Sequence, residues 1–320
     1  MILVAGIPDE SPVALVVDAI EASGADFRIF DQRRVAAVHL ALDIGDAPAG
    51  GALDGCFELD GETIPLRAIT GLYLRTMDDR LLPEIAECSA DAPERLHSRQ
   101  LHRLLLQWAD IMPGRVLNRP MSMASNMSKP YQAQTIRAAG FEIPETTITN
   151  DPDSARAFIE GVWADGGDVI YKSISGIRSI VQKLTRRDLD RLDRIRWCPT
   201  QFQRLVQGVD IRAHVIGRTV VATRIVSDGV DYRYAARETG TPAQLEAVTL
   251  EPAVEARCVA LAARLDLPLA GIDLRRAADG RVVCFEVNPS PAFSFYERAA
   301  GQSIAGCIAR YLAGDADWRA

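Results

Sequence analysis

The chain has 320 residues, a formal net charge of −7 and six cysteines that show no CxxC or Cys/His clustering. Its length suits two or three packed subdomains, and 48% apolar with 25% charged residues is typical of a folded globular protein. The negative charge argues against nucleic acid as a main partner, and the scattered cysteines argue against a zinc site. No apolar run reaches 18 residues and no charged leader opens the chain, so we expect a cytoplasmic protein without membrane span or signal peptide.

The first 115 residues predict an open α/β domain. Residues 2–7 and 27–30 are apolar runs typical of strands, and the segment between them has the pattern of a helix. Ser11 is the expected N-cap of that helix and Gly24 its end. A strand, a helix and a second strand in this order predict a βαβ unit. No GxGxxG follows the first strand, so a dinucleotide site has little support.

Further strands are expected at residues 35–42 and 70–75, followed by a helix over 93–110. Arg75 and Arg80 flank two aspartates just beyond the carboxyl end of the second of these strands. Ligand contacts in open α/β sheets usually lie at that end. A loop closed by salt bridges is the alternative, and we favour it.

Two lysines stand out in the middle of the chain, residues 116–204. Only three of the 36 basic residues are lysines, so each is a candidate for a site that needs a compact cation. Lys129 begins a predicted helix that ends at Gly140, and helix starts favour anions. Lys172 ends the predicted strand 168–172 and enters a loop of serine and glycine, whose small side chains let backbone N–H groups approach phosphates.

The segment from residue 200 onwards predicts further strands and helices. Alternating apolar residues indicate a strand and then a hairpin that turns at Gly217. Asp210 and Arg212 share one face of this hairpin because side chains alternate along a strand. A long helix is expected from residue 242 to about residue 266.

The segment 269–292 predicts a second hairpin, with a two-residue turn at Asp279-Gly280. Such a turn places Asp273 directly opposite Glu286, with Asn288 on the same face. The hairpin has no lysine or histidine, and two carboxylates with an amide oxygen suit Mg²⁺. A shift of one residue would move Asp273 to the other face. An ordinary amphipathic hairpin with its acids in solvent is the alternative.

These features occur in the order seen in ATP-grasp ligases. Lys129 is followed by a lysine that ends a strand 43 residues later, then by Q-x-x-x-x-G-x-D-I-R and by D…E-x-N. Over residues 116–313 the chain most resembles the RimK and glutathione-synthetase branch. Its segment NMSKPYQAQTIRAAGFEIPETTITNDP also resembles the graspetide (microviridin-type) ATP-grasp ligases. The resemblance implies an α/β fold with α+β subdomains: a pre-ATP-grasp domain (1–115), a central and lid subdomain (116–204) and a C-terminal subdomain with the metal site (205–320).

The resemblance also implies a nucleotide site. Lys129 and Lys172 would bind the phosphates of ATP, and Asp210 would contact the ribose. The lid loop over the phosphates would span residues 173–179, including Ser173, Ser175 and Gly176. Adenine would hydrogen-bond to the backbone that follows Gln203, namely that of Arg204, Leu205 and Val206.

The same resemblance assigns the metal and the reaction. Asp273, Glu286 and Asn288 would hold two Mg²⁺ ions (Mn²⁺ is an alternative), with Glu286 bridging. The basic residues expected near the transferred phosphate and the substrate carboxylate are Arg212, Arg224 and Arg233. The loop SISGIRS is poorer in glycine than in many relatives, and the segment from Ala292 to Glu297 is expected to shape a different acceptor pocket.

The implied activity is ATP-dependent ligation of a carboxylate to an amine or a hydroxyl through an acyl phosphate. The expected partners are a small-molecule or peptide carboxylate and a nucleophile, without nucleic acid or membrane, and a homodimer is left open. Three alternatives are a peptide-modifying macrocyclase, a kinase with the same fold and a nucleotide-binding protein without catalysis.

Overall fold

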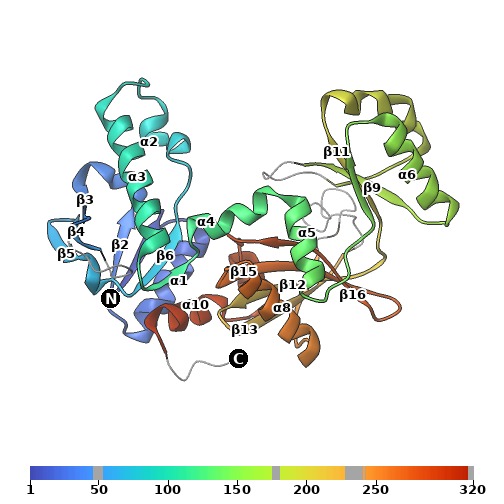
Figure 1. Ribbon diagram of the computed structural model, residues 1–320. Helices are drawn as coiled ribbons and strands as arrows, with labels where there is room; N and C mark the ends of the chain where they lie inside the picture. Colours follow the sequence, from blue (N-terminus) through green and yellow to red (C-terminus); the bar gives the residue numbers. More distant parts are fainter. Residues whose placement is uncertain (46–52, 175–180, 228–240, 242, 316–320) are drawn as a thin grey trace.

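The computed structural model describes residues 1–45, 53–174, 181–227, 241 and 243–315. Its strands form four sheets, two near the N-terminus, one in the middle of the chain and one five-stranded sheet towards the C-terminus (Figure 1). Among these residues no helix combines the length and the apolar character needed to cross a bilayer.

The first sheet confirms the predicted βαβ unit. It is parallel, in the order β2-β1-β6-β7, and its members are β1 (Ile2–Gly6), β2 (Phe27–Asp31), β6 (Gly71–Arg75) and β7 (Arg115–Leu117). Helix α1 (Ser11–Ser23) ends at Gly24, whose φ of 71° is the left-handed geometry that glycine adopts easily. The predicted N-cap at Ser11 is wrong. Glu10 holds that position, and Ser11 and Pro12 open the first turn, where proline is tolerated.

A three-stranded antiparallel sheet and a long helix complete the N-terminal part. The sheet consists of β3 (Val38–Asp43), β4 (Asp54–Leu59) and β5 (Glu62–Pro65). The strand predicted at 35–42 begins later, because residues up to Ala37 form the 3-10 helix η1 (Gln32–Ala37), capped by Asp31. Helix α3 (Pro93–Ile111) packs Leu105 and Trp108 into the core beneath. Shorter elements here are η2 (Leu66–Ala68), η3 (Asp79–Leu81) and α2 (Pro83–Ala86).

Arg75, the last residue of β6, and Arg80, in the loop after it, make different contacts. Arg80 forms an ion pair with Asp78, which confirms the salt-bridged loop. Arg75 instead donates from Nη1 to Ser290 Oγ at 3.0 Å and pairs with Glu10. It therefore ties the end of the N-terminal sheet to the loop after the predicted metal hairpin.

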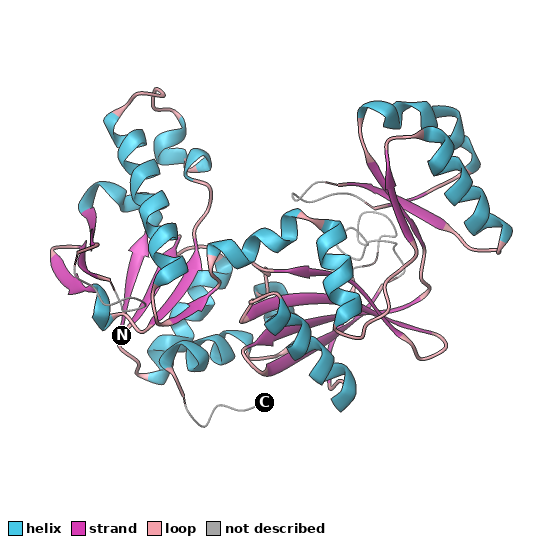
Figure 2. Cartoon of the chain, in the orientation of Figure 1, coloured by secondary structure: helices cyan, strands magenta, loops and turns pink. Residues whose placement is uncertain are grey.

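The middle of the chain forms a separate antiparallel sheet in the order β10-β9-β11-β8 (Figure 2). Its elements are β8 (Thr146–Thr149), α6 (Pro152–Ala164), β9 (Val169–Ser173), β10 (Gln182–Lys183), η5 (Arg186–Trp197) and β11 (Thr200–Arg204). Asp151 caps α6, since its side chain accepts a hydrogen bond from the Ser154 N–H. This lid sheet carries Lys172 near the end of β9.

The five-stranded core sheet is antiparallel, in the order β14-β13-β12-β15-β16. Its strands are β12 (Gly208–Ile216), β13 (Thr219–Val226), β14 (Gln244–Val248), β15 (Leu269–Ala277) and β16 (Val282–Asn288). The helix predicted from residue 242 is wrong in its first part, because Gln244–Val248 pairs with β13 as an edge strand. Helix α8 (Pro252–Arg264) begins only at Pro252, a residue suited to a first helical turn.

Helices cover the core sheet from both sides. Helices α5 (Lys129–Ala138) and α8 pack with the apolar residues of one face in a single cluster that includes Ile136, Ile211 and Leu261. On the other side lie α9 (Ser294–Ala300) and α10 (Ile304–Ala313). Helix α10 also packs against α1, so the C-terminal helix belongs to the core that joins the N-terminal sheet to the core sheet (Figure 1). The short α4 (Pro120–Met123) and η4 (Ala124–Met127) lead into α5.

Candidate functional site

The predicted pair of acids is present, but the hairpin that carries it differs from the prediction. Ala277 N–H donates to Arg281 O at 2.9 Å, so the loop between β15 and β16 has three residues and the predicted two-residue turn is wrong. This loop alone would shift the strands by one position. Phe285 forms a β-bulge in β16, between the residue paired with Leu274 and the residue paired with Asp273. This one extra residue cancels the shift. Asp273 therefore lies opposite Glu286, as predicted.

Strand β12 supplies the second half of this face. Arg212 is directly opposite Asp273, and its Nη1 lies 2.6 Å from Asp273 Oδ1. Two residues further along each strand, on the same face, Asp210 lies opposite Arg275. Its carboxylate accepts hydrogen bonds at 2.6 and 2.9 Å from two guanidinium nitrogens of Arg275. The predicted placement of Asp210 and Arg212 on one face is confirmed. Charges of opposite sign thus face each other across the two central strands.

Gly271 makes room for Arg212. A Cβ atom at Gly271 would lie 2.1 Å from Arg212 Nη2, well inside van der Waals contact. The guanidinium also lies 5.8 Å from the ring centroid of Tyr296, on α9. His214, next on this face, is fully buried, and its ring meets Tyr296 edge to face. Burial and the charge of Arg212 hold the pKa of His214 well below its usual value, which makes it a neutral packing residue.

Two lysines converge on Glu286 from different parts of the chain. Lys129 Nζ is 3.2 Å and Lys172 Nζ is 3.6 Å from Glu286 Oε2. Lys129 is held there because Gln132, one turn along α5, exchanges two hydrogen bonds with the backbone of Val287. Lys172 reaches the same oxygen from the lid sheet. The hairpin itself contains no lysine, and both lysines reach its acids from other segments of the chain.

The two carboxylates differ in their tendency to carry charge. Burial raises the pKa of Asp273, Arg212 opposes that effect, and the carboxylate of Glu286 adds to the rise. Burial also acts to raise the pKa of Glu286, but Lys172 and Lys129 together hold it below its ordinary value. Of the two carboxylates, Glu286 therefore has the stronger tendency to be ionised.

The donor set fits Mg²⁺. Across the described ranges there is no group of three or more His, Cys, Asp and Glu residues able to hold a metal, but Mg²⁺ usually takes one or two carboxylates and completes its shell with water and phosphate oxygens. Asp273 and Glu286 face each other, and Asn288 follows on the same strand opposite Gly271. Each carboxylate has about four lone-pair sites. The bonds to Arg212 and the lysines therefore leave capacity for a cation.

A cavity of about 860 Å³ adjoins this face. Its lining includes both lysines together with Gln203 and Phe285, from β11 and β16, and Thr146 from β8. It thus lies between the lid sheet and the core sheet, the place where the resemblance implies a nucleotide. The predicted adenine segment, Arg204 to Val206, runs from the last residue of β11 into the connection between the two sheets.

The connection itself is well anchored. Gln203 Nε2 donates to Thr146 Oγ1. The side chain of Arg204 pairs with Glu145 and Asp165 at the surface, and its N–H donates to Glu145 O at 2.9 Å. Leu205 N–H donates to Asp168 O at 2.8 Å, and Val206 O accepts from Arg275 at 2.7 Å.

Not every predicted site residue joins this constellation. Arg224 lies opposite Ile211, so it is on the other face of the core sheet, where it pairs with Glu246. Ser173 is exposed at the end of β9. The predicted Ser175, Gly176 and Arg233 lie outside the described residues.

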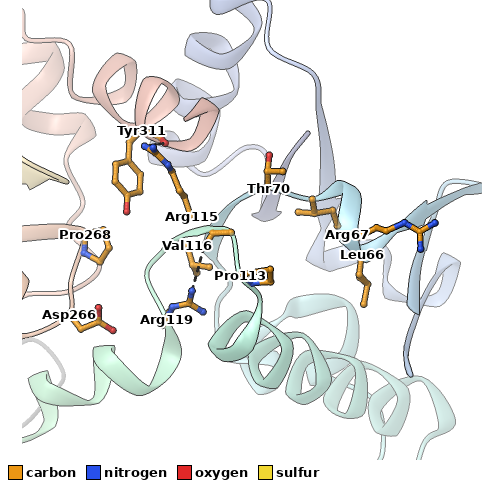
Figure 3. Close-up of a pocket in the computed structure, with 12 residues that line it drawn as sticks. Leu66, Arg67, Thr70, Pro113, Arg115, Val116, Arg119, Asp266, Pro268 and Tyr311 are labelled. Carbon is orange, nitrogen blue, oxygen red and sulfur yellow. Dashed lines mark hydrogen bonds between the residues drawn. The ribbon is translucent and has the colours of Figure 1, made fainter. Parts of the chain in front are cut away.

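A second cavity, of about 550 Å³, lies elsewhere, between the N-terminal part and the core sheet (Figure 3). Its two central arginines are engaged in structural bonds. Arg115 donates to Tyr311 O, and Arg119 donates to carbonyl groups at and just beyond the end of α3. We assign no ligand to it.

Comparison with known proteins agrees with this geometry. A family model described as a RimK-like ATP-grasp domain matches residues 127–312, more than half of the chain. The chain therefore belongs to the RimK-like ATP-grasp family, a family of ligases, and the predicted α/β ATP-grasp fold is confirmed. A probable alpha-L-glutamate ligase of Alkalilimnicola ehrlichii is 30% identical over 218 residues, which are 65% of this chain and 70% of the relative.

Two solved structures resemble the whole chain. The ATP-grasp ligase PsnB, in complex with a phosphomimetic variant of its minimal precursor, Mg and ADP, is 29% identical with a TM-score of 0.76, and the match covers 99% of this chain and 98% of PsnB. The macrocyclase MdnC from Microcystis aeruginosa, bound to its precursor peptide, is 21% identical with a TM-score of 0.78 over 98% and 99% of the two chains, and shows a shared fold.

Sequence reasoning missed two residues of this site. Arg275 was not singled out because it belongs to no motif, and only the register with Asp210 reveals its role. Phe285 was assigned to a regular strand, and nothing nearby in the sequence marks it as the bulge that points a side chain into the cavity.

Proposed function

We propose that this protein is an ATP-dependent ligase that activates a carboxylate as an acyl phosphate and joins it to an amine or a hydroxyl, with release of ADP. The observation that carries the proposal is the convergence of Lys129 and Lys172, which line the 860 Å³ cavity, on Glu286, which lies opposite Asp273. A cavity lined by two cations, with a pair of acids directly behind them, suits a triphosphate with its metal.

In the first step a substrate carboxylate oxygen bonds to the γ-phosphorus while the bond to the β-phosphate oxygen breaks, which yields ADP. Lys129 and Lys172 neutralise phosphate oxygens, and both side chains are partly buried, which strengthens the interaction. Arg212, on the floor of the same face, offsets the charge on the incoming carboxylate and the moving phosphoryl group.

In the second step the amine or hydroxyl bonds to the acyl carbon, phosphate leaves, and the nucleophile loses its proton. Asp273, Glu286 and Asn288 would hold two Mg²⁺ ions, whose charge would offset that of the phosphate oxygens. The chain contributes position and charge to both steps, and no serine or cysteine nucleophile is required.

A peptide is the acceptor or donor that we favour over a free amino acid. The likeness to PsnB, at 29% sequence identity, extends over 99% of this chain, including the N-terminal sheets. PsnB is described in complex with a precursor peptide. Arg75, which joins the N-terminal sheet to Ser290 in the loop after the acids, places that domain next to the reaction centre.

The test is an ADP-release screen of amino acids, short peptides and polyamines at fixed Mg-ATP, with hydroxylamine added in a parallel series. A ligase releases ADP only with its substrates, and hydroxylamine traps the acyl phosphate as a hydroxamate. A phosphorylated product that survives hydroxylamine would make the protein a kinase. ATP binding without substrate-dependent ADP release would identify a protein that binds nucleotide without catalysis.

A further inference from the structure

Arg275 lies at the point where three parts of the candidate nucleotide site meet. Its Nε and Nη2 donate to the two carboxylate oxygens of Asp210, at 2.6 and 2.9 Å. Its remaining nitrogen, Nη1, donates to Val206 O at 2.7 Å. The guanidinium carbon lies 5.2 Å from the ring centroid of Phe285. One planar cation thus binds a carboxylate, a backbone carbonyl and an aromatic face at once, which a lysine cannot do.

Each of these partners has a distinct place in the site. Asp210 is the residue expected to accept hydrogen bonds from the ribose. Val206 lies in the connection between the lid sheet and the core sheet. The N–H groups of the two residues before it, Arg204 and Leu205, donate to Glu145 O and Asp168 O on the lid side. Phe285, the bulged residue of β16, lines the cavity. Arg275 therefore fixes the core side of a connection whose other side is fixed to the lid.

Charge gives Arg275 a second effect. The side chains of Arg275 and Asp210 are only 16% and 22% exposed, so the pair is little screened by solvent. Without its partner, Asp210 would bring a third negative charge to a face that already carries Asp273 and Glu286, and that charge would repel a triphosphate. The bidentate pair neutralises Asp210 and leaves lone pairs on its oxygens for two hydroxyl donors.

We propose that Arg275 is a nucleotide-positioning residue that orients Asp210 for the ribose hydroxyls and fixes the lid–core connection at Val206. This inference rests on the proposed nucleotide site. It predicts that loss of Arg275 weakens nucleotide binding and removes discrimination between ribose and deoxyribose, because Asp210 is then free to rotate away from the sugar.

The test compares binding of Mg-ADP, 2′-deoxy-ADP and 3′-deoxy-ADP by calorimetry in the full chain. The wild type is expected to bind ADP about tenfold more tightly than at least one deoxy form, the size of one hydrogen bond to a charged acceptor. Arg275→Met is expected to raise the Kd for ADP by about tenfold or more and to bring the ADP to deoxy-ADP ratio close to one. A general loss of structure would weaken all three ligands equally and leave the ratio unchanged.

Arg276→Met is the matched control. Arg276 is the next residue of β15, on the opposite face, where it pairs with Glu251. Its replacement is expected to leave all three Kd values within about twofold. Arg275→Lys, which keeps the charge but not the planar set of donors, replaces Arg275→Met if that variant does not fold, and is expected to lose the ribose preference as well.

A double-mutant cycle sharpens the result. If Arg275 acts through Asp210, the change Arg275→Met should add little to the loss of ribose preference already caused by Asp210→Ala. The positioning role alone would be overturned by one result: Arg275→Met or Arg275→Lys binds ADP as tightly as the Arg276→Met control and still prefers ADP to the deoxy forms. Failure of the wild type to bind Mg-ADP would overturn the proposed function instead.

Discussion

In β12, β15 and β16 the two faces of the core sheet have opposite character. One face carries charges that pair across the strands, Arg212 with Asp273 and Arg275 with Asp210, and Glu286 on this face contacts the two lysines that line the cavity. The other face is apolar and buried against α5 and α8. Its members include Ile211, Ala213, Ile272, Leu274 and Val287.

The difference shows how strand alternation separates chemistry from stability. Every second residue of β12 and β15 belongs to the packed face, where removal of apolar surface from water stabilises the fold. Among the residues between them, Asp210, Arg212, Asp273 and Arg275 carry charges whose cost of burial is met by a partner of opposite sign. Further along the same face, Ile216 and Leu269 pack with α10. We therefore expect substitutions on one face to change activity and substitutions on the other to change stability.

The largest effect is expected at the acids and lysines. Glu286→Gln or Lys172→Ala should lower ADP release by about a hundredfold to a thousandfold, since each removes a charge that acts on the phosphates. Thermal unfolding should change little, because neither side chain belongs to an apolar cluster. Turnover near that of the wild type in either variant would contradict the assignment of the site.

The packed face should give the reverse result. Leu274 lies between Asp273 and Arg275 in the sequence but points into the core and is 1% exposed. Leu274→Ala should lower the free energy of unfolding by about 2–5 kcal/mol, the usual cost of a large cavity in a core. Urea unfolding measures this change. At a temperature where the variant is folded, its Kd for Mg-ADP should match that of the wild type, and a large change in that Kd would show that the two faces are not independent.

The hairpin shows how far the sequence could predict this division. Alternation and the Asp-Gly pair predicted that Asp273 lies opposite Glu286, which is right, although the predicted turn is wrong. A three-residue loop shifts the strands, and the bulge at Phe285 shifts them back. Neither deviation has a local signal, because a bulge is selected by packing and by the site that it serves.

Residues brought together from distant segments were predicted less well. The scarcity of lysine singled out Lys129 and Lys172 and the resemblance assigned them to phosphates, but their meeting on a single oxygen of Glu286 depends on how the lid sheet and α5 sit on the core. The strand β14 was taken for helix, because its residues favour a helix when the edge of β13 is not considered. Sequence patterns thus predicted most helices and strands of each subdomain. The contacts between distant segments, which bring the site residues together, depend on tertiary packing.

A smaller effect on activity is expected at Gly271, where the charged face leaves no room for a larger side chain. Gly271→Ala would place a Cβ 2.1 Å from Arg212 Nη2, so the guanidinium must move and its bond to Asp273 must weaken. We expect kcat to fall by about tenfold, roughly the cost of one weakened charged hydrogen bond. Gly161→Ala, in α6, is the control, since a Cβ there meets no atom within 4 Å. Unchanged kcat in Gly271→Ala would show that the position of Arg212 is not important for the reaction.

The smallest effect is expected at Arg224, and it tests the division of the faces most directly. Sequence resemblance grouped Arg224 with Arg212 as a basic residue near the transferred phosphate. The pairing of β12 with β13 instead places it opposite Ile211, on the packed face, where its half-exposed side chain pairs with Glu246. An exposed ion pair contributes little to stability, so Arg224→Ala should leave both the unfolding temperature and kcat/KM within about twofold of wild type. Arg212→Ala, measured beside it, should lose most of its activity. A large loss in Arg224→Ala would mean that the side chain reaches the substrate around the sheet edge, and the strict assignment of one face to chemistry would then be wrong.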